Sequence, residues 1–247
     1  MELAERANAG VHSHVADKVT EILLDKNSTI LDVGCGTGAL LARLATLGYK
    51  HLSGIDISLP TDPVDGITFL EHDLDTIATP YPDSAFSLVI SVEVFEHVEN
   101  MGTLLRELSR LLAPDGNLLI TTPNVHSLEA RLRYFLLGRL KQFDELGDPT
   151  HIYPIFLYTF TRLLKRYSLE IVETWGFPLD GSSPTSRGIL RLTTKLLQLA
   201  GLKAVPPGDH LCLLIRRAHD QAPLRSTSKR ALVASHYPNA SESSTQC

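Results

Sequence analysis

Apolar residues recur with two alternating periods along the first half of the chain. Short, mostly apolar runs, typical of buried parallel strands, occupy 28–33, 51–57, 67–70, 86–92 and 117–122. Segments with apolar positions three and four residues apart, typical of helices, lie before or between these runs at 11–25, 37–47 and 102–112. The alternation predicts an α/β fold, a doubly wound parallel sheet with helices on both faces.

The pattern continues less regularly toward the carboxyl end. A helix is predicted at 157–167, followed by strands at 169–174 and 210–216. Two insertions, 126–153 and 181–208, interrupt this part, and the second contains a helical pattern at 189–199. From residue 220 the chain is rich in Ser, Ala, Thr and Pro, a composition typical of disorder. We therefore expect one domain over 1–219 with two cap insertions, and a disordered tail over 220–247.

Composition and charge exclude several classes of protein. The 247 residues carry a formal charge of −5, so we expect no nucleic-acid partner. The three cysteines, Cys35, Cys212 and Cys247, form no CxxC pair, and we expect no metal site. The sequence shows neither the apolar core of a signal peptide nor an apolar run long enough for a transmembrane helix. These features predict a cytoplasmic protein, and they do not indicate an oligomeric state.

The candidate chemistry begins at a glycine loop after the first strand. Gly34, Gly36 and Gly38 follow an apolar run and open a helix. Glycines permit positive φ and let a ligand approach the backbone, and a helix start attracts anionic groups. Asp56 ends the next strand, about 20 residues later, where an acidic side chain accepts hydrogen bonds from ribose hydroxyls. The glycine loop, the helix start and Asp56 together predict a nucleoside-containing cofactor.

The loop itself distinguishes between two kinds of cofactor. Its pattern is GxGxG, and Ala39 stands where a dinucleotide-binding GxGxxG loop has its third glycine. Asp32 lies directly before the loop. A carboxylate there repels a pyrophosphate but pairs with the amino group of a methionine moiety. The loop favours S-adenosylmethionine over NAD.

A family resemblance rests on this loop and on four later segments. The run ILDVGCGTGA over 30–39 resembles the first motif of class I S-adenosylmethionine-dependent methyltransferases. GIDIS over 54–58, HDL over 72–74 and LLAPDGNLLI over 111–120 resemble later motifs of that family. SVEVFEHV over 91–98 resembles the subgroup of ubiquinone-biosynthesis O-methyltransferases. The likeness covers residues 11–123 well and gives no guidance after about Arg217.

The resemblance implies a Rossmann-like, seven-stranded sheet that is mostly parallel, with an antiparallel last strand. It also implies a set of residues at the S-adenosylmethionine site: Asp32, Gly34, Cys35, Gly36, Gly38, Asp56, Ile57, Asp73, Leu74 and Ser91. Cys35 is expected to contribute its backbone and not to act as a nucleophile. For Asp73, a role in capping a turn stays open.

Two histidines are candidates for a catalytic base, which a protonated acceptor such as a hydroxyl requires. His97 follows the fourth strand, near the expected methyl group, and imidazole titrates near neutral pH. A structural role for His97 stays open. Glu93 and Glu96 are interpreted as groups that orient His97, contact the cofactor or remain solvated. His151 lies near the end of the first cap insertion, where it could act as a base, contact the substrate or pack in the structure.

The segment 128–143 is the main sequence clue to the acceptor. It combines four basic residues with apolar and aromatic ones. Three interpretations stay open: a helix packed on the core with solvated arginines, a lid over a lipid-linked or aromatic acceptor, or a contact with an anionic membrane.

Motifs that the chain lacks narrow the reaction. It has no Pro-Pro-Tyr-type motif after the fourth strand, no Pro-Cys nucleophile and no carboxylate cluster for magnesium. We therefore expect O-methylation of a small metabolite, glycan or lipid-linked intermediate. The alternatives are an NAD-dependent Rossmann oxidoreductase and a non-catalytic, methyltransferase-like partner protein.

Overall fold

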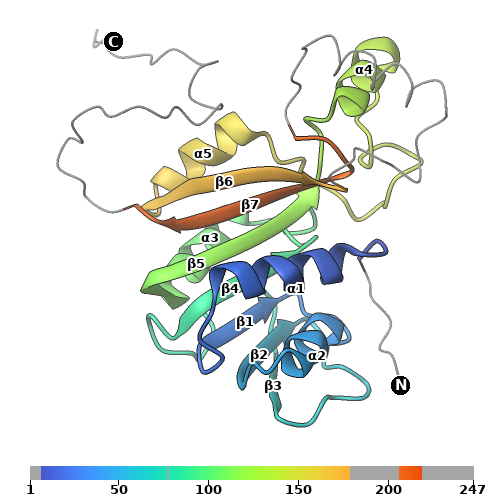
Figure 1. Ribbon diagram of the computed structural model, residues 1–247. Helices are drawn as coiled ribbons and strands as arrows, with labels where there is room; N and C mark the ends of the chain where they lie inside the picture. Colours follow the sequence, from blue (N-terminus) through green and yellow to red (C-terminus); the bar gives the residue numbers. More distant parts are fainter. Residues whose placement is uncertain (1–6, 77, 179–205, 219–247) are drawn as a thin grey trace, which may run out of the picture.

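The computed structural model describes residues 7–76, 78–178 and 206–218. They form a seven-stranded sheet of order β3-β2-β1-β4-β5-β7-β6 (Figure 1). The strands are β1 (Thr29–Val33), β2 (His51–Asp56), β3 (Ile67–Glu71), β4 (Phe86–Val92), β5 (Leu112–Pro123), β6 (Leu169–Phe177) and β7 (His210–Arg217). The helices are α1 (Val11–Ile22), α2 (Ala39–Thr46), α3 (Met101–Leu111), α4 (Leu128–Leu137) and α5 (Leu157–Lys165).

The first five strands are parallel, and β7 is the antiparallel strand. β1 pairs with β2 and β4, β2 with β3, and β4 with β5, all in parallel register. β7 lies antiparallel between β5 and β6. The predicted α/β sheet with an antiparallel last strand is confirmed. This topology gathers the carboxyl ends of the parallel strands, and the start of β7, at one edge of the sheet.

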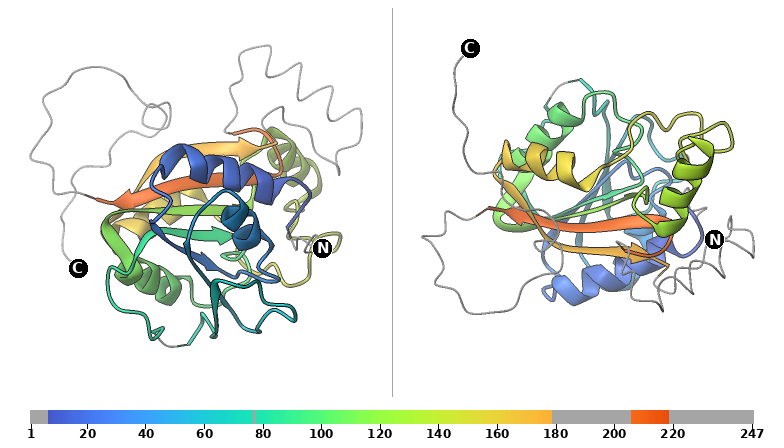
Figure 2. Two further views of the ribbon diagram at one scale, coloured as in Figure 1. Left: turned by 60° about the horizontal axis from the view of Figure 1, so that its bottom comes forward. Right: turned by 90° about the horizontal axis from the view of Figure 1, so that it is seen from above.

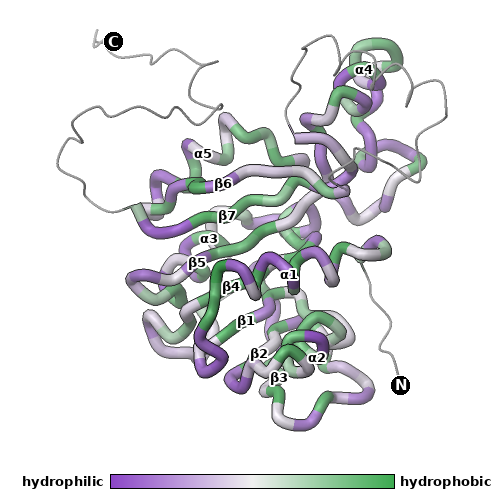
Figure 3. The backbone as a smooth tube through the Cα atoms, in the orientation of Figure 1, coloured by the Kyte–Doolittle hydropathy of each residue, from purple (hydrophilic) through white to green (hydrophobic). Residues whose placement is uncertain are grey.

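Apolar side chains cover both faces of the sheet, as expected for parallel strands. Ile30 and Leu88 point to a core shared with α1 and α2. Leu31 and Val89 point to the opposite core, shared with α3 and α5. Figure 2 shows α1 on one side of the sheet and α3 and α5 on the other. The central strands are correspondingly hydrophobic in Figure 3.

Several boundaries differ from those predicted. The first helix ends at Ile22 because the chain leaves the helix at Leu23. β5 begins at Leu112, whereas the sequence predicts a strand only from 117. A register shift between Phe86 and Leu88 lets the extra residues join the strand. β6 also continues three residues further than predicted.

The first cap insertion contains a shorter helix than the sequence suggested. α4 stops at Leu137 because Gly138, with φ 64°, adopts the left-handed conformation that ends helices. Among the described helices, none is long and apolar enough to cross a membrane. The helix predicted at 189–199 and the tail at 220–247 lie outside the described residues.

Candidate active site

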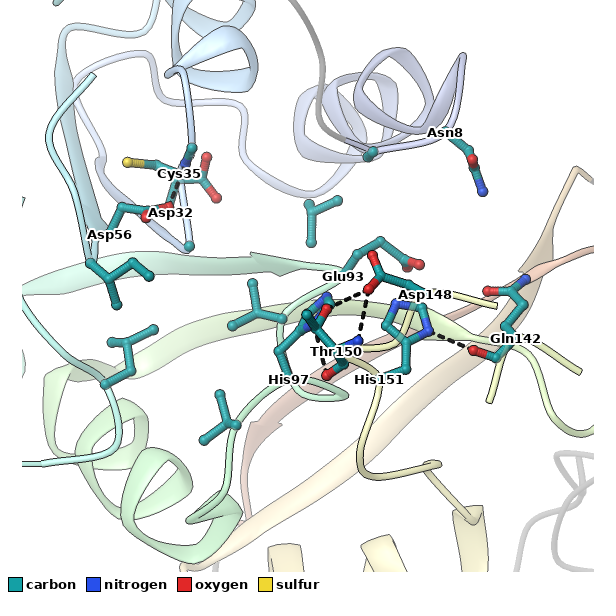
Figure 4. Close-up of a pocket in the computed structure, with 18 of the residues that line it drawn as sticks. Asn8, Asp32, Cys35, Asp56, Glu93, His97, Gln142, Asp148, Thr150 and His151 are labelled. Atoms are coloured by element: carbon teal, nitrogen blue, oxygen red, sulfur yellow. Dashed lines mark hydrogen bonds between the residues drawn. The ribbon is translucent and has the colours of Figure 1, made fainter. Parts of the chain in front are cut away.

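A pocket of about 1070 Å³ lies at the edge of the sheet where the parallel strands end. Figure 4 shows Asp32, Cys35 and Asp56 in one part of it. His97 and the loop carrying Asp148, Thr150 and His151 lie in another part. The candidate cofactor residues and the candidate bases therefore face one space.

The glycine loop has a backbone that other residues adopt only with strain. Gly34 has φ 76°, and a Cβ added there would lie 2.3 Å from Val94 Cγ2. Gly38 has φ 77°, and its added Cβ would lie 2.9 Å from Phe69 Cζ. Gly34 and Gly36 line the pocket, whereas Gly38 serves as the N-cap of α2 and is not among the lining residues. A direct contact of Gly38 with the cofactor stays a prediction.

Two carboxylates flank this loop. Asp32 is 2% exposed, and burial, followed by the charge of Asp56, raises its pKa to about 7. Asp56 accepts a 2.7 Å hydrogen bond from Gly36 N–H through Oδ2. A cationic group placed next to Asp32 would restore its charge, since an opposite charge favours the ionised form.

The remaining predicted cofactor residues occupy different places. Ile57, Asp73 and Leu74 line the pocket. Asp73 also closes a turn, accepting a hydrogen bond from Asp75 N–H at 2.9 Å, so the pocket and turn-capping interpretations are both compatible with its position. Cys35 lines the pocket as a thiol that forms no disulfide in the described part of the chain, and its N–H donates to the carbonyl of Ile55.

Ser91 departs from its expected place. It is fully buried within β4, between Val33 on β1 and Ile120 on β5. It is not among the residues that line the pocket, and its hydroxyl has no hydrogen-bond partner in the described part of the chain. Its contact with the cofactor stays a prediction.

The cofactor part of the pocket suits S-adenosylmethionine. Gly34 and Gly36 present their backbone to the pocket, where a ligand can approach a chain without side chains closely. Asp32 offers a buried carboxylate to an ammonium group, and Asp56 and Asp73 offer carboxylates to hydroxyl and amino groups. The ammonium, hydroxyl and amino groups of the cofactor thus have complementary carboxylates among the lining residues, and the buried Asp32 carboxylate would repel a pyrophosphate.

His97 is held by the loop that closes the first cap insertion. Its Nδ1 lies 2.9 Å from Thr150 Oγ1 and 3.2 Å from the Thr150 carbonyl oxygen. The Thr150 hydroxyl donates to Asp148 Oδ1 at 2.6 Å. Burial, and then the adjacent His151, lower the pKa of His97. A neutral imidazole at physiological pH is the state a general base requires.

His151 lies beside His97 and is oriented separately. The two ring centroids are 4.7 Å apart in an edge-to-face arrangement. His151 Nδ1 lies 2.9 Å from the carbonyl oxygen of Gln142, and since a carbonyl only accepts, Nδ1 carries the hydrogen. The Nε2 atom of neutral His151 is therefore left unprotonated, as a base or a substrate contact requires.

Glu93 and Glu96 are not solvated loop charges, so that interpretation is wrong. Glu93 has φ 53° and receives a hydrogen bond from the Thr121 hydroxyl. Its Oε2 lies 3.1 Å from His210 Nδ1. These contacts tie Glu93 to β5 and β7, and since Glu93 also lines the pocket, its contact with the cofactor stays a prediction.

Glu96 is fully buried behind the loop. The Thr122 hydroxyl donates to its Oε2 at 3.1 Å, and burial, then the charge of Glu93, raise the pKa of Glu96 well above its usual range. One candidate ligand atom from each of Glu96, His97 and His151 lies within 4.8 Å of the others. The sequence predicts no metal here, and a raised pKa weakens the Glu96 carboxyl as a ligand, because carboxyl groups bind metal ions in their ionised form.

Sequence reasoning missed residues contributed by distant segments. Asn8, Gln142 and Asp209 also line the pocket, and His210 is 2% exposed behind Glu93. The position of Asp209 and His210 could have been predicted from the direction of β7. An antiparallel strand starts at the edge where its parallel neighbours end, and His210 pairs with Pro123 at the end of β5.

The basic residues of the first cap insertion are mostly paired. Lys141 is buried between Glu129, at 3.0 Å, and Asp209, at 2.7 Å. Arg133 pairs with Asp144, and Arg139 with Glu145 at 3.3 Å. The interpretation with solvated arginines holds for Arg131 and Arg139, which are exposed, and fails for Arg133, which is half-buried against Asp144. Lys141 is buried between its acidic partners.

Comparison with known proteins agrees with the motifs. A family model described as a methyltransferase domain matches residues 7–174. The chain is 27% identical to the ubiquinone biosynthesis O-methyltransferase of Neisseria meningitidis serogroup A, covering 63% of this chain and 69% of that protein. It is 29% identical to the 27-O-demethylrifamycin SV methyltransferase of Amycolatopsis mediterranei, over 48% of each chain.

A solved structure agrees at the level of the fold. The 1,6-didemethyltoxoflavin-N1-methyltransferase of Burkholderia thailandensis, with bound S-adenosylhomocysteine, matches with a TM-score of 0.53 and 14% identity, covering 85% of this chain and 80% of that one. The matched region spans only part of several curated relatives: 36%, 48% and 60% of the length of three of these proteins.

The family model covers well over half of the chain, from ahead of α1 to β6. It includes the glycine loop, both candidate bases and the first cap insertion. The resemblance drawn from the motifs is thereby confirmed, and S-adenosylmethionine is the cofactor assigned to the pocket. The chain belongs to the methyltransferase-domain family, as a class I, S-adenosylmethionine-dependent member.

Proposed function

We propose that this chain transfers the methyl group of S-adenosylmethionine to a hydroxyl of an acceptor, with His97 as the general base. The proposal rests on one observation: the candidate cofactor residues and the candidate bases line the same pocket. Asp32 and the glycine loop suit the cofactor, and two neighbouring imidazoles lie in the same space. A hydroxyl acceptor needs a base, and a neutral imidazole supplies one.

Each residue has a separate task in this proposal. When bound, S-adenosylmethionine supplies an electrophilic methyl group on its sulfonium. Asp32 binds the ammonium end of the methionine moiety, and Asp56 binds the ribose hydroxyls. His97 Nε2 accepts the proton that the acceptor hydroxyl loses. Positioning of acceptor and methyl group supplies much of the remaining acceleration.

The acceptor we propose is a small metabolite, a glycan or a lipid-linked intermediate. Asn8, Gln142 and Asp148 give the acceptor region hydrogen-bonding groups suited to hydroxyls. Leu146 also lines the pocket while 79% exposed, and Phe135 on α4 is 83% exposed. These apolar side chains support contact with the lipid part of an acceptor or with a membrane surface.

Binding measurements separate this proposal from the two alternatives. Calorimetric titration with S-adenosylhomocysteine and with NAD should show binding of the first alone. Membership of the methyltransferase-domain family sets the oxidoreductase alternative aside, and NAD binding without S-adenosylhomocysteine binding would contradict it. A non-catalytic partner protein predicts that Gly36→Arg abolishes cofactor binding while the biological role persists. Transfer of labelled methyl groups into cell extracts, followed by mass identification, would then reveal the acceptor.

A further inference from the structure

A turn of the first cap insertion is fastened to the loop that carries His97. The N–H groups of Ile152 and Tyr153 both donate to the Glu96 carbonyl oxygen, at 2.8 and 3.1 Å. His97 itself lies at the end of a turn closed by its N–H and the Val94 carbonyl. These bonds hold residues 148–150 against the imidazole of His97 (Figure 4).

Counting hydroxyl hydrogens fixes the direction of the bond between Thr150 and His97. The Thr150 hydroxyl has one hydrogen, and it is donated to Asp148 Oδ1 at 2.6 Å. Its oxygen therefore acts as an acceptor toward His97 Nδ1, 2.9 Å away. The Thr150 carbonyl, 3.2 Å from the same nitrogen, only accepts as well. Both contacts require a hydrogen on Nδ1.

We infer that Asp148 and Thr150 are positioning residues, which hold His97 in the tautomer with hydrogen on Nδ1 and leave Nε2 free to act as the base. Asp148 acts through Thr150, because its carboxylate takes the hydroxyl hydrogen that would otherwise be available to His97. The inference rests on the proposed function for its catalytic meaning. It gives the cap insertion a part in the chemistry besides covering the pocket.

The Asp148 side chain is suited to this task. Oδ1 also accepts the Thr150 N–H at 2.8 Å, closing a tight turn. Its bonds to Thr150 lower the pKa of the Asp148 carboxyl, so it stays ionised and able only to accept. An ionised aspartate here cannot reverse the chain of hydrogen bonds, because it has no hydrogen to donate to the Thr150 hydroxyl. Oδ1 accepts both the N–H and the hydroxyl of Thr150, so an amide oxygen held by the same N–H can take over its role.

His151 provides an internal reference. Its Nδ1 hydrogen is directed to the Gln142 carbonyl at 2.9 Å, independently of Asp148 and Thr150. Substitutions in the turn should therefore change the tautomer of His97 and leave that of His151 unchanged. A variant in which both change has lost the local fold.

Nitrogen-15 NMR of the histidine side chains tests the inference without any acceptor. Long-range proton–nitrogen spectra of the full chain report which ring nitrogen carries the hydrogen, and the signals absent from His97→Gln identify His97. In the wild type, His97 should be mainly the Nδ1–H form at a pH where it is neutral. Finding mainly Nε2–H would overturn the inference.

Paired variants sharpen the test. Thr150→Val removes the hydroxyl at nearly constant shape, and the ratio of Nδ1–H to Nε2–H should fall by about threefold or more, the effect of one hydrogen bond. Thr150→Ser should restore it. Thr20→Val, on a half-buried threonine of α1 whose hydroxyl donates to the Asp17 carbonyl, is the matched control and should change nothing.

Asp148 is tested in the same way. In Asp148→Ala the Thr150 hydroxyl is free to donate to His97 Nδ1, so the ratio should again fall by about threefold or more. Asp148→Asn keeps an accepting oxygen and should preserve the ratio. An unchanged ratio in Asp148→Ala or in Thr150→Val contradicts the inference. If His151 signals show that Asp148→Ala disrupts the turn, Thr150→Val alone decides.

Methyl-transfer assays distinguish this inference from the proposed function. If the tautomer responds as described but His97→Ala leaves methyl transfer unchanged, the proposed base is wrong and the positioning stands. If His97→Ala slows methyl transfer but the His97 tautomer ratio is unchanged in the Asp148 and Thr150 variants, His97 remains the proposed base and the positioning role of Asp148 and Thr150 is wrong. When both hold, the fall in transfer rate for Asp148→Ala should be absent in Asp148→Asn.

Discussion

At the residue scale, the pocket contains a buried carboxyl whose ionised form destabilises the folded protein when no ligand is bound. Asp32 is a fully buried carboxyl whose pKa rises to about 7. Such a group favours the folded state only while it is protonated. Its position makes sense if a cation compensates its charge, and the ammonium of the cofactor is that cation in our account.

Replacing Asp32 should therefore stabilise the free protein while weakening cofactor binding. The folded-state pKa of about 7 exceeds the ordinary value of 3.8, so ionisation lowers stability progressively as pH rises from about 4 to 7. Asp32→Asn should raise the melting temperature at pH 8 by several degrees, with a smaller gain at pH 5. S-Adenosylhomocysteine affinity should fall about tenfold or more.

Thermal unfolding of both proteins at the two pH values checks this prediction. Asp73→Asn, an exposed carboxylate of the same pocket whose turn bond an amide oxygen can replace, is the control and should leave the melting temperature unchanged. If Asp32→Asn raised the melting temperature equally at pH 5 and pH 8, the gain could not come from removing the ionisation of Asp32.

At the element scale, the strand–loop–helix unit from β1 to α2 could be predicted from the sequence because its determinants are local. The apolar run of β1, the three glycines and the helical spacing after Gly38 all lie within neighbouring positions. The contacts of Lys141 and Thr150 could not be predicted. They depend on residues 68 and 53 positions away, and no periodicity reports which side chains two irregular segments bring together.

The glycine loop offers a test with a matched control. Gly34→Ala combines a positive φ of 76° with a Cβ that overlaps Val94, whereas Gly48→Ala has φ 92° and nothing within 4 Å of its added Cβ. Gly48→Ala should cost about 1 kcal/mol from backbone strain alone, and Gly34→Ala more, by about 1–3 kcal/mol. Urea unfolding measures both.

A second substitution identifies the source of the extra cost. Adding Val94→Ala to Gly34→Ala removes the methyl group that the new Cβ meets, so part of the loss should be recovered. Equal losses in Gly34→Ala and Gly48→Ala would show that the close approach of the loop to Val94 is not what requires glycine.

At the scale of the whole molecule, the cap insertion is attached to the sheet by a buried ion cluster. Lys141 has a side-chain exposure of 7% and bridges Glu129 to Asp209, which directly precedes β7. The sequence presented Lys141 as one of four basic residues on a candidate membrane surface. Its burial followed from partners far along the chain, which explains why composition alone suggested the wrong environment.

Lys141→Met should therefore be strongly destabilising. Removing one partner of a buried ion pair leaves uncompensated charge and costs about 3–5 kcal/mol. Arg139→Met, which breaks the exposed pair with Glu145, should cost less than about 1 kcal/mol. Hydrogen exchange of residues 138–153 should accelerate only in Lys141→Met. Equal effects of the two substitutions would contradict a structural role for the buried cluster.

The central claim is that the pocket transfers a methyl group to an acceptor deprotonated by His97. Methyl transfer from labelled S-adenosylmethionine, with S-adenosylhomocysteine affinity measured in parallel, tests it in the wild type and in His97→Ala. The account predicts at least about a tenfold lower transfer rate with unchanged affinity, because His97 acts on the acceptor and not on the cofactor. An unchanged transfer rate, or a loss explained by weaker cofactor binding, would contradict it.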